Sequence, residues 1–135
     1  MYREVIKPRT VAKPGAPYAN AIKVRGFGSL IFIAGVLPND IDGNIVCKGD
    51  IVGQTRQVVK NLIATLEAAG ANPGNVVKTT TYVVESAMVD FQKTSASIDC
   101  LSPFCTPTDT LVGVTRLACS EEGQLIEVNA IAVTE

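Results

Sequence analysis

The sequence predicts an α+β fold, a two-layer sandwich in which helices cover one face of a mixed sheet. Apolar residues recur at three- and four-residue steps from Val52 to Ala69, which is typical of an amphipathic helix. A dense run of β-branched residues follows at Val76–Val84, and Gly70 with the Asn72-Pro73-Gly74 segment separates the two. Shorter β-like runs flank this pair. The predicted element order is β-β-α-β-α-β-β.

The N-terminal half contains two short β-like runs and a loop before the first helix. Residues 21–25 and 30–34 flank a glycine-rich turn at residues 26–29, which predicts an antiparallel hairpin. Residues 35–46 are rich in turn formers and are expected to form a loop. Asp50 stands where an N-cap residue is expected for the helix that follows.

A second helix is expected over residues 87–101, and Pro103 and Pro107 end it. Its expected apolar face is Met88, Phe91, Ser95 and Ile98. Two further strands are expected over residues 110–117 and 125–133. In the last strand, alternation places one set of side chains under the helices: Ile126, Val128, Ala130 and Ala132. The opposite face then receives Leu125, Glu127, Asn129 and Ile131, and we expect Asp109, Leu111 and Gly113 to share it.

Composition limits the class of protein. A length of 135 residues predicts one domain, and 47% hydrophobic residues with a mean hydropathy of +0.26 favour burial between copies in an oligomer. A net charge of −1 argues against nucleic-acid and membrane-surface binding. The first residues resemble no signal peptide and no apolar run has transmembrane length, so a cytoplasmic location is expected.

The inventory of reactive residues is short. The four cysteines show no C-x-x-C spacing and are expected to be free thiols in a reducing compartment. The chain has no histidine, which removes the commonest metal ligand and the commonest general base. We therefore expect no metal and no cofactor, and we expect acid–base chemistry from carboxylates, tyrosine, lysine or cysteine. Cys105 is interpreted as an inert thiol because no basic neighbour activates it.

Several segments together carry a family resemblance. They are Ala16-Pro17-Tyr18, LIFIAG at residues 30–35, GQTRQVV, LEAAGA, VVKTTTYV and the final LIEVNAIAV. With the order of elements, they resemble the reactive intermediate deaminase family, also called Rid or YjgF-like, over nearly the whole chain. The resemblance implies a single Rid-like domain over residues 1–135 with a chorismate-mutase-like fold. It also implies a homotrimer around a central β-barrel, with clefts between subunits that receive a small-molecule substrate.

The chain departs from the family at one informative position. The resemblance implies a P-x-R-[ST] motif whose arginine holds the carboxylate of a 2-imino acid, yet this chain reads Pro107-Thr108-Asp109-Thr110. At about 4 Å and an effective dielectric of about 20, this charge reversal is worth several kcal/mol. Rejection of the usual 2-imino acids is therefore expected. Ala34 and Leu111 replace a hydroxyl and a thiol of the family pattern, while Tyr18, Gly35 and Glu127 match it.

These residues predict a hydrolase or deaminase that acts on a small imine, enamine or related C–N compound. Glu127 would position or deprotonate water, and Asp109 would bind a positive group or donate a proton. The expected substrate-binding residues are Tyr18, Ala34, Gly35, Leu111 and Asn129. Two alternatives are open. One is a structural Asp109 paired with Arg116 or Lys78, and the other is a non-catalytic trimer of the same fold that binds a small molecule or a partner protein. Endoribonuclease activity is disfavoured by the acidic balance and the missing histidine.

Overall fold

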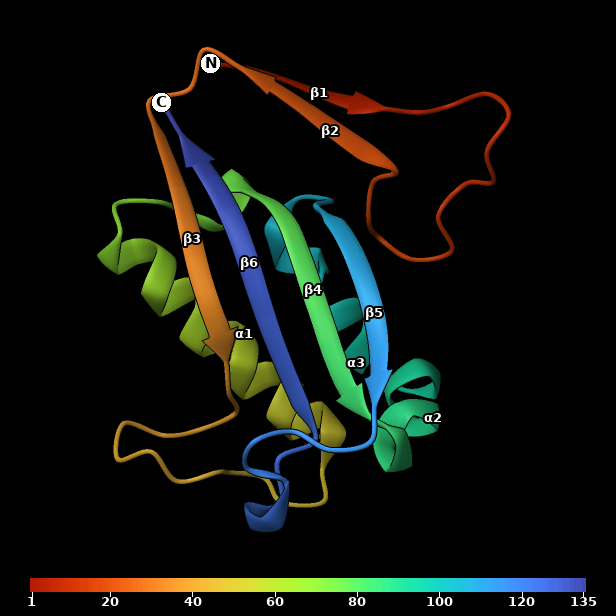
Figure 1. Ribbon diagram of the computed structural model, residues 1–135, viewed down its shortest axis with the longest axis vertical. Coiled ribbons are helices and arrows are strands. Elements are labelled where there is room, and N and C mark those ends of the chain that lie inside the picture. Colours follow the sequence, from red (N-terminus) through yellow and green to blue (C-terminus); the bar gives the residue numbers. More distant parts are fainter.

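The computed structural model describes residues 1–135 as a two-layer α+β sandwich with a small β-ribbon at one end (Figure 1). The main sheet has the strand order β3-β6-β4-β5, and the helices cover one of its faces. The strands are β1 (Tyr2–Ile6), β2 (Ala21–Arg25), β3 (Ser29–Val36), β4 (Val76–Val84), β5 (Thr108–Val114) and β6 (Ile126–Thr134). The helices are α1 (Ile51–Ala68), α2 (Glu85–Lys93) and α3 (Ala96–Asp99), with single 3₁₀ turns at Pro73–Asn75, Ser102–Phe104 and Ser120–Glu122. The predicted fold class is confirmed.

Helix α1 forms as its sequence predicts. The Asp50 side chain accepts a hydrogen bond from the Gly53 backbone N–H at 3.0 Å, so the predicted N-cap is confirmed. Leu62 and Leu66 on its apolar stripe are fully buried against the sheet. Gly70 ends the helix with a φ of +76°, a left-handed conformation that glycine adopts without strain.

The central strands carry the alternation that the sequence predicts. In β6, Ile126, Val128, Ala130 and Ala132 are buried under the helices, while Glu127 and Asn129 are only half-buried on the open face. Strand β4 pairs antiparallel with β6 and parallel with β5. Its connection to β5 runs through α2 and α3, the kind of crossover that parallel strands require.

Three sequence predictions are wrong. The runs at residues 21–25 and 30–34 do not form a hairpin, because β2 pairs with the unpredicted strand β1 and β3 pairs with β6. The second helix is divided into α2 and α3 at Thr94, whose backbone is extended with a ψ of −177° and whose hydroxyl donates to the Asp90 carbonyl at 2.6 Å. Ile98, expected on the apolar face, is 49% exposed.

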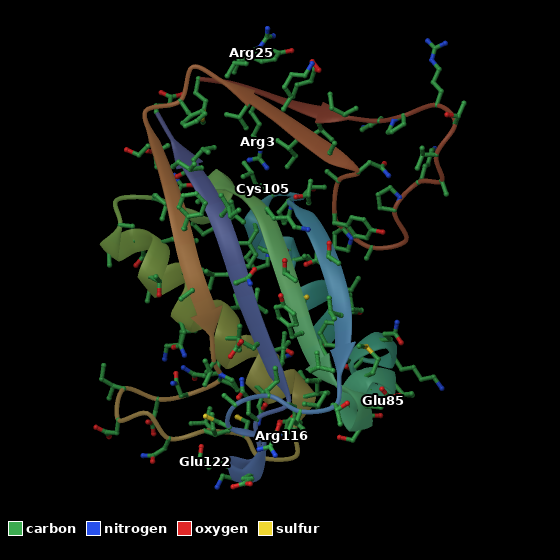
Figure 2. All side chains as sticks on the ribbon, viewed as in Figure 1. Arg3, Arg25, Glu85, Cys105, Arg116 and Glu122 are labelled. Carbon is green, nitrogen blue, oxygen red and sulfur yellow. The ribbon has the colours of Figure 1, made fainter.

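The β1–β2 ribbon crosses the end of the main sheet at which both termini lie (Figure 1). Arg3 of β1 points down from the ribbon toward Cys105 (Figure 2) and donates to the Val76 carbonyl at 3.3 Å and to the Cys105 carbonyl at 3.5 Å. The guanidinium therefore ties the ribbon to the starts of β4 and β5.

The face of the sheet opposite the helices has no covering layer. Phe32 of β3, which pairs with Ile131 of β6, is 73% exposed on it, and Leu30 is 46% exposed. An apolar sheet face of this kind calls for a partner. None of the helices has both the length and the apolar character needed to cross a bilayer.

Candidate functional site

Glu127 and Gly35, two sequence-predicted site residues, lie against each other at the end of β3. A Cβ atom added to Gly35 would stand 2.7 Å from Glu127 Oε2 and 2.8 Å from its Cδ. Only glycine leaves room for the carboxylate at this distance. The register of β3 against β6 shifts between Ile33 and Val36, so Gly35 lies within an irregular stretch that brings its backbone close to Glu127.

Two buried glutamines, missed by the sequence analysis, hold the segment that leads into Glu127. Gln124 is 1% exposed and donates from Nε2 to Glu127 Oε1 at 3.4 Å, while its Oε1 accepts from the Cys119 N–H at 3.0 Å. Gln54 of α1 donates to the Gly123 carbonyl at 2.7 Å and accepts from the Leu125 N–H at 2.8 Å. Helix α1 thus fixes the residues immediately before β6. The hydrogen bond from Gln124 then restrains the orientation of the Glu127 carboxylate.

Tyr82 is a further neighbour that sequence reasoning missed. It pairs with Glu127 across β4 and β6, and both side chains are half-buried on the open face. Asn129 lies on the same face, paired with Thr80. Knowledge of the β4–β6 register would have identified Tyr82, because cross-strand partners share a face.

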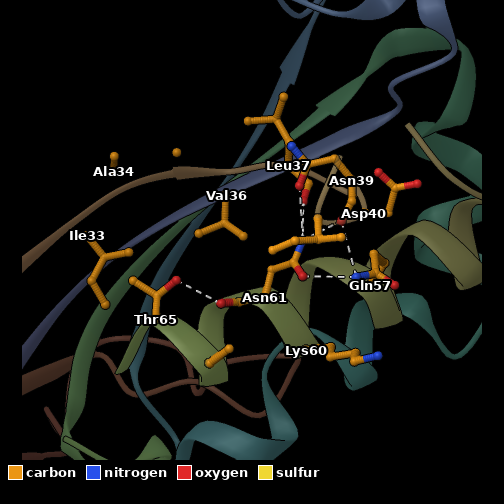
Figure 3. A pocket seen from close by; sticks show the side chains of 13 residues that line it. Ile33, Ala34, Val36, Leu37, Asn39, Asp40, Gln57, Lys60, Asn61 and Thr65 are labelled. Atoms are coloured by element: carbon orange, nitrogen blue, oxygen red, sulfur yellow. Dashed lines mark hydrogen bonds between the residues drawn. The ribbon is translucent and has the colours of Figure 1, made fainter. Parts of the chain in front are cut away.

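A groove of about 730 Å³ runs along the free edge of β3, between that strand and α1 (Figure 3). Ala34 and Gly35 form part of its wall, so Gly35 contacts Glu127 and lines the groove. On the other wall, Asn61 donates to the Leu37 and Asn39 carbonyls, both at 2.9 Å. This amide network fixes the loop that follows β3 and gives the groove a defined floor.

Asp109 lies elsewhere, on edge strand β5. Its Oδ1 accepts from the Thr79 hydroxyl at 2.7 Å and from the Thr81 hydroxyl at 3.0 Å, and both threonines are buried. The Thr79 hydroxyl has the Thr108 carbonyl as a second acceptor at the longer distance of 3.4 Å. The expected alternative partners are engaged elsewhere: Lys78 donates to Thr110, and Arg116 pairs with Glu121.

The expectation that Asp109 and Glu127 share a face of the sheet is therefore wrong. Asp109 pairs with Thr79, whose side chain lies on the helix-covered face, whereas Glu127 pairs with Tyr82 on the open face. Gly113 also faces the helices, since a Cβ added to it would lie 3.4 Å from Met88 of α2. A strand's register decides which face each side chain takes, and a shift of one residue reverses all of them.

The remaining predicted binding residues also lie in two separate regions of the chain. Tyr18 lines a pocket of about 510 Å³ beside the N-terminal segment, with Lys7, Arg9, Lys13 and Thr106. The Ala19 N–H donates to the Pro107 carbonyl at 2.8 Å, which places this pocket beside the start of β5. Leu111 of β5 is 38% exposed. Within one chain, Tyr18, Asp109 and Leu111 are thus separated from Ala34, Gly35 and Glu127.

Two of the four cysteine thiols, Cys100 and Cys119, have a raised pKa. Burial raises the pKa of Cys100 to about 12, with a further contribution from the Asp109 charge. A hydrogen bond to Glu122 raises the pKa of Cys119, and the Glu127 charge adds to this. Neither thiol is therefore activated as a nucleophile. No group of three or more cysteine, aspartate and glutamate side chains is placed to hold a metal ion.

Comparisons with known proteins identify sequences and structures that are similar to this chain. The family model described as Endoribonuclease L-PSP matches residues 9–134. A RutC family protein of Pyrococcus abyssi is 39% identical over 135 residues, covering 100% of both chains. A crystal structure of a Rid family protein of Yersinia pestis superposes with a TM-score of 0.80 at 30% identity, covering 98% of this chain and 99% of the other.

The chain belongs to the Rid/YjgF family. Another member, the 2-iminobutanoate/2-iminopropanoate deaminase of Salmonella typhimurium, is 32% identical over 127 residues, covering 93% of this chain and 97% of that one. The family resemblance read from the sequence is thereby confirmed.

Proposed function

We propose that this Rid protein is a hydrolytic deaminase that acts on a small imine or enamine other than the usual 2-imino acids. The observation that carries the proposal is the Glu127 carboxylate, which accepts a hydrogen bond from Gln124 and contacts Gly35. Gly35 lines the groove along β3, whereas Glu127 itself does not line it. The naming of relatives as 2-iminobutanoate/2-iminopropanoate deaminases supports the reaction class. Asp109, which stands where the family resemblance implies a carboxylate-binding arginine, argues against the same substrates.

The chemistry needs one placed water and one proton carrier. Glu127 takes a proton from water while the water oxygen bonds to the carbon of the protonated imine, giving a neutral carbinolamine. The same carboxyl group then gives this proton to nitrogen, and it takes the hydroxyl proton as the C–N bond breaks, so that the carbonyl forms and ammonia leaves. The proton that the imine carried passes to ammonia or to solvent. The products are one carbonyl compound and one ammonia for each imine and water. The backbone at Gly35 lines the position in which the imine would lie.

We further propose that the site is completed by a second copy, in a homotrimer. Gly35 and Asp109 lie on β3 and β5, the two edge strands, with β6 and β4 between them. Three strand spacings separate these edges by roughly 14 Å. A small ligand that contacts both residues therefore needs Asp109 from one chain and Glu127 with Gly35 from another. The exposed Phe32 and Leu30 on the open face support such an assembly.

Ammonia release tests the proposal. Imines are generated in situ from a panel of amines that includes carboxylate-free and amine-bearing members, and release is followed with the wild-type protein. Glu127→Gln should abolish release and leave ligand binding nearly unchanged, because the amide keeps the shape but takes no proton. Glu121→Gln, a change at a solvent-exposed carboxylate on the turn before β6, is the matched control and should behave like the wild type. Full release by Glu127→Gln would refute the assigned role.

The alternative is a non-catalytic small-molecule binder with the same fold. One observation favours it: the two threonine hydroxyls give Asp109 Oδ1 a complete set of partners in the absence of any ligand. Tight binding of panel members without ammonia release from any of them would select this alternative.

A further inference from the structure

The Asp109 carboxylate has one oxygen saturated and the other free. Oδ1 accepts two hydroxyl hydrogen bonds, at 2.7 Å and 3.0 Å, which fill the two lone-pair positions of a carboxylate oxygen. Oδ2 has no partner in the chain. Because no buried side-chain oxygen is left without a partner, Oδ2 of this half-buried residue reaches the surface. The carboxylate is thus fixed on one side and open on the other.

The groups that fix it are rigid. Thr79 and Thr81 lie on β4, the strand between β6 and β5, and are 0% and 1% exposed. Their hydroxyls have no access to water, so they are committed to acceptors within the protein. The parallel register that pairs Thr79 with Asp109 holds the donors and the acceptor on neighbouring strands. The orientation of the carboxylate is therefore set before any ligand arrives.

We propose that Asp109, fixed by Thr79 and Thr81, is the ligand-selecting group of this protein and that it takes a primary ammonium group. One free oxygen suits a single N–H donor, whereas the two parallel hydrogen bonds of a guanidinium need both oxygens of a carboxylate. This inference rests on the function proposed above. It specifies the substrate class as an imine or enamine that carries a primary ammonium group where the 2-imino acids carry a carboxylate.

A second charged region on the same side of the molecule has the opposite preference. Lys7, Arg9 and Lys13 line the pocket beside Tyr18, no carboxylate lines it, and none of the three cations has an ion-pair partner. An anion is drawn to that pocket and an ammonium group to Asp109. Two probes of equal size and opposite charge therefore report on different residues.

The test is binding, followed by NMR on the wild-type protein with n-propylammonium, n-propylguanidinium and propionate. We expect n-propylammonium to shift the signals of Asp109, Thr79 and Thr81, and n-propylguanidinium to bind no more tightly. Asp109→Asn should weaken ammonium binding about tenfold or more, since it removes a charge-assisted hydrogen bond. Thr81→Val, which keeps the side-chain shape and removes one hydroxyl, should weaken it by a smaller factor. Asp90→Asn, at an exposed position of α2, is the control and should change nothing.

Two results would overturn the inference: propionate shifting the Asp109 signals as strongly as n-propylammonium, or unchanged ammonium affinity in Asp109→Asn. The proposed reaction fails separately. Asp109-dependent ammonium binding without ammonia release from any imine would support the role of Asp109 and refute the proposed deaminase activity. Release only from carboxylate-bearing imines, unaffected by Asp109→Asn, would leave the enzyme and remove the inference.

Discussion

Gly35→Ala separates the position of the Glu127 carboxylate from the stability of the fold. The added Cβ would stand 2.7 Å from Oε2 and 2.8 Å from Cδ, against about 3.4 Å for an ordinary contact, so the carboxylate must retreat by about 0.7 Å. The obstructing atoms are the far end of a flexible side chain, and Glu127 is only half-buried. The retreat should therefore cost less than about 1 kcal/mol of unfolding free energy, below the usual overpacking penalty.

The functional loss should be much larger than the loss of stability. A displacement approaching 1 Å at a reacting group lowers turnover by up to about 100-fold, so we expect ammonia release to fall about 10- to 100-fold. Urea unfolding and the imine panel measure the two quantities on the same preparation. Gly15→Ala is the matched control, because no atom lies within 4 Å of its added Cβ. Unchanged release in Gly35→Ala, or a loss of more than about 3 kcal/mol in stability, would refute the reasoning.

Four further outcomes are expected. The wild-type protein should release ammonia from 2-iminopropanoate far more slowly than an arginine-bearing relative, and Asp109→Arg alone should restore little, because Ala34 and Leu111 also differ from the family pattern; a rate equal to the relative's would contradict the role given to Asp109. Cys100 should resist a thiol reagent that modifies exposed Cys47 and Cys105. Because folding raises the pKa of Cys100 from 9.0 to about 12, its contribution to stability is complete below pH 9 and is lost as pH rises toward 12, by at most about 1.4 kcal/mol per pH unit in urea unfolding. Asp50→Ala should lower the unfolding free energy by about 1 kcal/mol through loss of the α1 cap, and an unchanged urea midpoint would show that the cap hydrogen bond contributes nothing.

The elements predicted well from the sequence are those whose pattern is local. Helix α1 has a long apolar stripe, a cap at Asp50 and a glycine stop at Gly70, and its position follows from these alone. Strand β4 and the inward face of β6 follow from the density and alternation of β-branched residues. Gly35 and Glu127 were both expected in the site through the family resemblance, and the structure places them in contact. Gly35 itself was expected in a loop and lies in β3.

What the sequence did not predict depends on pairing between distant segments. Whether β2 pairs with β3 or with β1 depends on strand partners far apart in the chain. The N-terminal run Tyr2–Ile6 is as long as β2 but has Arg3 and Glu4 side by side, which breaks the alternation of apolar and polar residues. The face of Asp109 depends on how the chain enters β5, where Cys105 and Thr106 both adopt positive φ, 55° and 60°. Two consecutive left-handed residues alter the direction of the backbone in a way that residue alternation does not reveal. Gln124 was missed because a buried glutamine has no sequence signature.

Mixed assemblies of two impaired variants, assayed at substrate concentrations well below the wild-type Kd, test the central claim, a deaminase site shared between chains. Glu127→Gln chains and Asp109→Asn chains are co-expressed with different tags, purified through both tags, and assayed for ammonia release on the imine panel. If each site takes Glu127 from one chain and Asp109 from its neighbour, every trimer that carries both tags has one of its three sites rebuilt, which is about a third of the sites. The mixture should then show about a third of wild-type release, while each variant alone shows little. A mixture no more active than its components would contradict the shared site.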